Sequence, residues 1–197
     1  MSESLTISLY LTTAVTVFLL LFMSVSVYNN LIEVSKEVKK SWANIDVILK
    51  QRYDEIPKLI EICNQYIEHE VAMIDRIMES REKLVGAENS RKEKMKASEE
   101  VSKSLKGLLA LSEGYPEIKA NNNFIQIQNK ISKLEDTLAD RREYYNSSVT
   151  IYNTRIEQIP YVFFTPILGY KEEVLFKVSE EEKAYPELKI DTLKRNA

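Results

Sequence analysis

The sequence is poor in cysteine, histidine and glycine, and each scarcity excludes a class of protein. Its one cysteine, Cys63, leaves no internal disulfide. Its one histidine, His69, excludes zinc sites with three histidines and di-iron bundles with two Glu-x-x-His motifs. These two side chains are six positions apart, nearly opposite on a helix, so they do not form a nucleophile and base pair. The four glycines form no phosphate-binding loop. We therefore expect no catalytic residues, no cofactor and no metal site.

Helix-breaking residues and an excess of positive charge are missing as well. The first glycine is Gly86, and five prolines occur in 197 residues, which is typical of long helices with few turns. The chain has 27 Lys and Arg against 30 Asp and Glu, a net charge of −3. A surface that binds nucleic acid normally carries a basic patch. We predict an all-α protein that does not bind nucleic acid.

Charge of either sign is absent between Glu3 and Glu33, and this gap contains a long apolar run. Residues 5–28 are about 24 uncharged, mostly apolar residues, which at 1.5 Å each exceed the ~30 Å of hydrocarbon in a bilayer. The alternative is a secretory signal, which needs Lys or Arg before a shorter apolar core. We predict a transmembrane helix at residues 5–28, preceded by a short tail of residues 1–4.

Basic residues beside the span predict its orientation. Lys36, Lys39 and Lys40 follow the span, and no Lys or Arg precedes it. Because loops rich in Lys and Arg stay in the cytoplasm, we expect the N-terminus outside and the C-terminal bundle in the cytoplasm. A single cysteine in the polar part is consistent with this reducing compartment.

Apolar residues at steps of three and four predict amphipathic helices after the span. We expect four, at about residues 29–53, 55–85, 90–113 and 122–159. Their alternating directions give an antiparallel up-and-down bundle over residues 29–160. The first boundary has two interpretations. Either Asp54 caps a new helix with Pro57 in its first turn, which we favour, or Pro57 kinks one long helix and three helices remain.

Two local signals belong to the third predicted helix. Ser90 and Glu93 have the spacing of a capping box, in which each satisfies a free backbone N–H of the other. Gly107 lies inside the helix, where it costs ~1 kcal/mol relative to Ala. It marks either a close helix crossing or a tolerated weak point.

Two blocks of the sequence resemble the LemA family. Residues 28–61 contain Tyr-Asn, Trp, Ile-Asp-Val, Leu-Lys-x-Arg and Ile-Pro elements. Residues 115–160 contain Tyr-Pro-x-hydrophobic-Lys-Ala, Asn-x-Phe and Arg-x-x-Tyr-Asn elements and a Tyr-Asn before a terminal Pro. With the apolar span, the likeness covers residues 1 to about 176. The segment 168–171 matches the family's Phe-Gly-Phe-Lys only loosely. The resemblance implies a single-pass membrane protein with an antiparallel helical bundle and no catalytic residues.

The segment after Pro160 is rich in aromatic and apolar residues, and a charged tail completes the region 161–197. With four helices, the last one ends near the membrane where the first began, so this segment reaches the bilayer surface. Aromatic rings suit a membrane interface. The alternative is that they cap the apolar end of the bundle. The residues concerned are Tyr161, Phe163, Phe164 and Tyr170.

A short motif occurs twice. Tyr115 and Pro116 begin the sequence Tyr-Pro-Glu-Ile-Lys, and Tyr185 and Pro186 begin Tyr-Pro-Glu-Leu-Lys in the tail. Either the tail copy binds a groove that normally holds the loop copy, in the same or another subunit, or the similarity is due to chance.

These features together predict a non-enzymatic scaffold or adaptor that is anchored in the lipid bilayer and forms homo-oligomers. The alternatives are a regulatory partner of a membrane enzyme such as a metalloprotease, a class found beside other members of the family, and an enzyme with no recognisable site. Tethering to a membrane raises the effective concentration, so weak contacts between bundles are sufficient for assembly.

Overall fold

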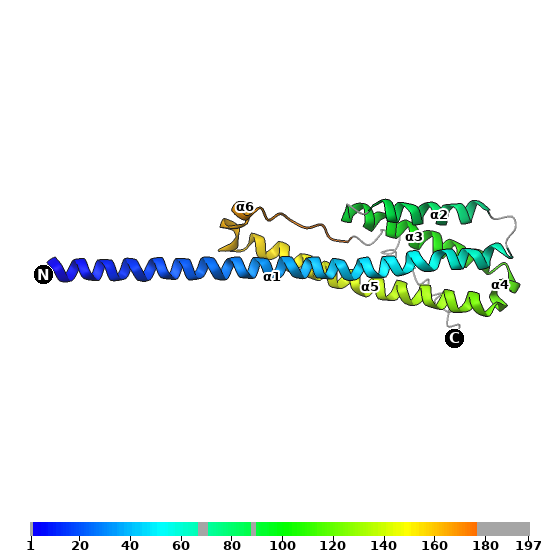
Figure 1. Cartoon of the computed structure of the whole chain (residues 1–197), viewed down its shortest axis with the longest axis horizontal. Coiled ribbons are helices and arrows are strands. Elements are labelled where there is room, and N and C mark those ends of the chain that lie inside the picture. Colours follow the sequence, from blue (N-terminus) through cyan, green and yellow to red (C-terminus); the bar gives the residue numbers. More distant parts are fainter. Residues whose placement is uncertain (1, 67–70, 88–89, 177–197) are drawn as a thin grey trace, which may run out of the picture.

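The N-terminal helix is the axis of the molecule. The computed structural model describes residues 2–66, 71–87 and 90–176. In it, α1 (Ser2–Asn64) is one continuous helix whose first half stands alone and whose second half packs into a bundle (Figure 1). Within the described chain, α1 is the one helix long and apolar enough to cross a membrane, and its apolar window is not buried by other elements.

The predicted break before Pro57 is wrong, because α1 runs through this proline to Asn64. A proline inside a helix has no N–H for the carbonyl four residues earlier, which here belongs to Tyr53. That carbonyl accepts a hydrogen bond from Arg81 Nε at 3.2 Å, and the guanidinium also lies 3.5 Å from the centre of the Tyr53 ring. The neighbouring helix therefore satisfies the group that the proline leaves free.

The chain reverses after α1 and forms a helical hairpin of α2 (Val71–Gly86) and α3 (Arg91–Ser112). The second helix therefore begins at Val71 and not at residue 55. Ser90 caps α3 by accepting a hydrogen bond from the Glu93 backbone N–H, which is one half of the predicted capping box. The Ser90 N–H donates instead to the Ala87 carbonyl at 3.2 Å. A Cβ added at Gly107 would lie 3.2 Å from Met73 Cε of α2, so this glycine marks a close helix crossing.

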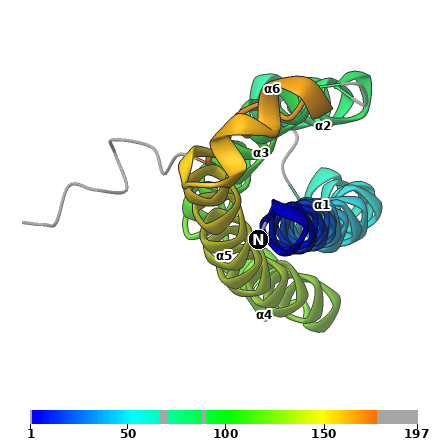
Figure 2. The same cartoon turned by 90° about the vertical axis from the view of Figure 1, so that its left-hand side faces the viewer.

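The last long helix returns along the first. After the short α4 (Pro116–Ala120), α5 (Asn122–Glu157) starts at an Asn121 cap and packs antiparallel beside α1, while α2 and α3 group on one side of this pair (Figure 2). The helices bury a common apolar core. It includes Leu31, Val38, Trp42, Ile45, Leu49, Ile56, Leu59, Ile77, Val101, Leu105, Leu108, Phe124, Ile131, Leu138, Tyr145 and Val149.

Beyond α5 the chain turns and doubles back. A 3₁₀ helix, η1 (Tyr161–Phe163), leads into the short α6 (Thr165–Leu168), and residues 170–176 then lie extended along the bundle (Figure 1). The described residues form helices and connecting segments without a β-strand, so the predicted all-α bundle is confirmed.

Candidate functional site

The end of α5 lies against α1 where the apolar run meets the bundle. Val27 and Leu31 of α1 are buried there. Arg155 of α5 donates a hydrogen bond to the Asn30 side chain and another, of 3.2 Å, to the Tyr161 hydroxyl. These contacts hold the segment after α5 beside the point on α1 where its isolated apolar part ends and its packed part begins (Figure 1).

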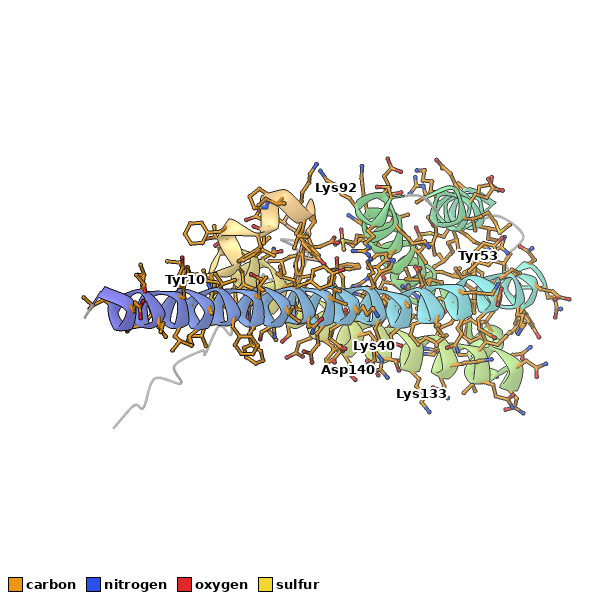
Figure 3. All side chains as sticks on the ribbon, turned by 60° about the vertical axis from the view of Figure 1, so that its left-hand side comes forward. Tyr10, Lys40, Tyr53, Lys92, Lys133 and Asp140 are labelled. Atoms are coloured by element: carbon orange, nitrogen blue, oxygen red, sulfur yellow. The ribbon has the colours of Figure 1, made fainter. Side chains whose placement is uncertain are left out.

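An exposed apolar surface forms at this level. Ile159 is 78% exposed, Phe163 66% and Ile167 83%, and no Asp, Glu, Lys or Arg occurs between Glu157 and Lys171. We call this surface the apolar foot; it consists of Ile159, Val162, Phe163, Ile167 and Leu168. Figure 3 shows Tyr10 on the isolated part of α1, whereas the labelled charged residues Lys40, Lys133 and Asp140 lie on the bundle.

The four aromatic residues singled out from the sequence do not share one surface. Tyr161, Phe164 and Tyr170 are partly buried and pack against the core, as a cap of the bundle would, while Phe163 points outward. The aliphatic members of the foot were missed because the prediction relied on aromatic rings. Their signal was the uncharged run around Pro160 and Pro166.

One of the two copies of the Tyr-Pro motif lies within the described residues. Tyr115 precedes α4 at the end of the bundle far from the foot, where it is partly buried, and Pro116 is the first residue of that helix. Tyr185 and Pro186 lie outside the described residues. The hypothesis that the two copies share a groove stays a prediction.

Residues 171–176, which we call the strap, are bound to α5 by two Tyr-Asn pairs. Asn153 forms two hydrogen bonds with the Glu173 backbone, at 2.9 and 3.0 Å, and Asn146 forms two with the Phe176 backbone, at 2.7 and 2.8 Å. The adjacent tyrosine hydroxyls donate to the strap carbonyls of Lys171 and Val174, at 2.9 and 3.0 Å.

We call the hydrogen bonds between the two Tyr-Asn pairs and the strap the ladder. Its two tyrosine hydroxyls donate hydrogen bonds to backbone carbonyls. Burial raises the pKa of both Tyr145 and Tyr152, so it favours the protonated hydroxyl that donates to the strap. The amide of Asn offers one donor and one acceptor to a backbone, as a neighbouring β-strand does. These bonds reach the backbone of the strap and not its side chains.

Two side chains of the strap contact the bundle. Glu173 forms an ion pair of 2.8 Å with Arg91 of α3. The Phe176 ring is 3% exposed and lies 4.3 Å below the Arg142 guanidinium. Val174 and Leu175 between them remain exposed. An acidic residue three positions before an aromatic one is thus the pattern that this surface accommodates.

A buried ion pair connects three helices inside the bundle. Arg52 of α1 is 1% exposed in its side chain and lies 2.6 Å from Glu135 of α5. It also donates to the Ser102 hydroxyl of α3 at 3.1 Å. Burial lowers the pKa of Arg52, and the Glu135 carboxylate opposes this shift. Both contacts use Nη2, and the buried Nε and Nη1 atoms of Arg52 have no hydrogen-bond partner among the described residues. The cluster therefore joins α1, α3 and α5 through one guanidinium nitrogen.

Two further polar features of the bundle are a buried thiol and a cleft with a charged pair. Cys63 is fully buried, and burial raises the pKa of its thiol to about 11, so the nucleophilic thiolate is scarce. A cleft of about 390 Å³ between α1, α2 and α3 contains Asp46 and Lys94, which pair with each other at 2.9 Å. In the described parts of the chain, His, Cys, Asp and Glu form no group of three or more that could hold a metal.

Comparisons with known proteins point to one family. The model of the LemA family matches residues 41–190. Magnetosome protein MamQ 2 of Paramagnetospirillum magneticum is 22% identical over 175 residues, covering 76% of this chain and 64% of its own length. Protein LemA of Metamycoplasma hominis is 24% identical over 173 residues, covering 85% and 77%. The chain thus spans slightly less than two thirds of the magnetosome relative.

Proposed function

Because the chain belongs to the LemA family, we propose that it is a non-enzymatic scaffold or adaptor that is anchored in a membrane and associates with further copies of itself. The observation that carries this proposal is the continuity of α1, which extends without interruption from an unaccompanied apolar run into the core of the bundle. A rigid connection of this kind fixes the height and direction of the bundle relative to the bilayer.

The apolar foot supports a second contact with the same bilayer. It lies beside the end of the apolar part of α1, where Tyr28 is 48% exposed. Exposed apolar groups without neighbouring charge insert into the interface between headgroups and acyl chains. We assign this role to Phe163 with the aliphatic residues around it, while Tyr161, Phe164 and Tyr170 attach the foot to the bundle.

The orientation is proposed from the charges that follow the span. Lys36, Lys39 and Lys40 are exposed on α1 just beyond the level of the foot, where they would meet the anionic headgroups of a cytoplasmic leaflet. The bundle is then cytoplasmic and the N-terminus lies outside.

Self-association is tested by the size of the particles in native membranes. We expect mass photometry of polymer-extracted native nanodiscs to give particles with two or more copies of the full chain, because the shared membrane raises the effective concentration of weak contacts. The measurement is repeated at about tenfold lower expression. Particles with two or more copies that persist at this level result from assembly and not from chance proximity in a crowded membrane. Single copies at both expression levels would contradict the scaffold.

A further inference from the structure

The two Tyr-Asn pairs of α5 form a built site for an extended peptide. Asn146 and Asn153 are seven residues apart, which is about two helical turns, so they share a face. Each amide bonds both the N–H and the C=O of a single strap residue. This arrangement resembles strand addition, in which main-chain hydrogen bonds provide affinity and side-chain contacts provide specificity.

Two side chains of the strap contact this site. Its anchors are the ion pair between Glu173 and Arg91 and the buried ring of Phe176. The strap joins α6 at Gly169, whose φ of 74° is a left-handed conformation that favours glycine. One short connection therefore determines whether the strap returns to its own bundle.

We propose that this site on α5 and α3, the strap groove, takes the strap of a second copy, so that two copies exchange these segments. This inference rests on the proposed self-association and gives it a contact. The strap makes the same bonds with the same side chains whether it comes from the same chain or another. Release at Gly169 costs the hydrogen bond of 3.0 Å between the Tyr170 N–H and the Thr165 carbonyl. The membrane tether favours exchange, since neighbouring grooves lie at the same height above the bilayer.

A charge reversal tests the exchange in the full-length protein. In a copy with Arg91→Glu the groove repels its own Glu173, and in a copy with Glu173→Arg the strap is repelled by its own Arg91. Only exchange between these two copies restores both ion pairs. With distinct tags, we expect the mixed pair to co-purify about five times more than either variant paired with itself. A chain with both substitutions serves as control and should behave like the original protein.

The outcomes separate this inference from the proposed function. If the mixed pair is not enriched although tagged copies of the original protein co-purify, exchange is overturned and self-association stands. If the original copies do not co-purify either, both proposals are overturned. Equal melting temperatures of the two single variants, measured by circular dichroism, show that unequal folding does not cause the difference.

A peptide measurement tests the groove itself. A fluorescent peptide with the sequence of residues 170–176 should bind the full-length Glu173→Arg protein in detergent about ten times more tightly than the same peptide with Phe176→Ala, because the aromatic anchor is lost. Equal binding of the two peptides would contradict the groove as a sequence-selective site.

Discussion

Single side chains explain how a bundle with few glycines keeps one arrangement. Arg52 touches α3 and α5 from α1, and its guanidinium is almost fully enclosed. A buried charge is tolerated only with its partner in place. A shift of α5 by one turn would separate Arg52 from Glu135, so this contact penalises other registers of the α1 and α5 pair.

Cys63 is predicted to be inert. With a thiol pKa of about 11, roughly one molecule in a thousand carries the thiolate at pH 8. We expect alkylation by iodoacetamide at pH 8 to be about 100-fold slower in the folded protein than in urea. Mass spectrometry of timed samples gives both rates. Rapid labelling of the folded chain would show that the thiol is accessible and would reopen a nucleophilic role.

At the scale of elements, the interior proline of α1 is stabilised by another helix. The Tyr53 carbonyl, left free by Pro57, is bonded by Arg81 of α2, so the two residues should be energetically coupled. Pro57→Ala should stabilise the protein by about 1–3 kcal/mol, because it removes a clash and restores a helical hydrogen bond.

The coupling is measured by a double-mutant cycle. Arg81→Ala should cost about 1 kcal/mol less in the Pro57→Ala background than in the original chain, since the Tyr53 carbonyl then has a helical partner. Thermal unfolding in detergent, followed by circular dichroism, gives the four stabilities. The contact between Arg81 and the Tyr53 ring is lost in both backgrounds and cancels. Additive effects would contradict this account of the continuous helix.

The position of the first reversal could not be read from the sequence. The prediction placed it before Pro57, whereas it follows Asn64, where neither glycine nor proline occurs and where Gln65 and Tyr66 form tight turns with Ile62 and Cys63. Local propensity gives no signal there, and tertiary contacts from α2 decide that α1 continues. The chain still reverses once between the first helix and the second, although later in the sequence than predicted. The helices after this reversal therefore run in the predicted directions.

At the scale of the whole molecule, the foot and the span are predicted to meet one bilayer. A Phe163→Trp chain reconstituted with lipids brominated on their acyl chains should lose about half of the added tryptophan emission, because the foot would insert 5–10 Å into the interface. Trp42 is buried in the bundle and gives a constant background.

An Ile125→Trp chain is the matched control for this measurement. Ile125 is also an exposed apolar residue, 39% accessible, but it lies at the start of α5, at the opposite end of the bundle. Its added emission should be unchanged by bromine. Equal quenching at both positions, or none at residue 163, would remove the second membrane contact.

The apolar span, the all-α class, the cap at Ser90 and the family could be predicted from the sequence, because periodicity, capping and uncharged length are local properties of a chain. The packing of the helices was needed to show which residues after Pro160 face outward and why Pro57 does not end α1. It was also needed to show that the strap is bound by Tyr145, Asn146, Tyr152 and Asn153. The hydrogen bonds concerned join groups that are 19 to 30 residues apart in sequence. Their proximity is set by the packing of the long helices and not by any local preference.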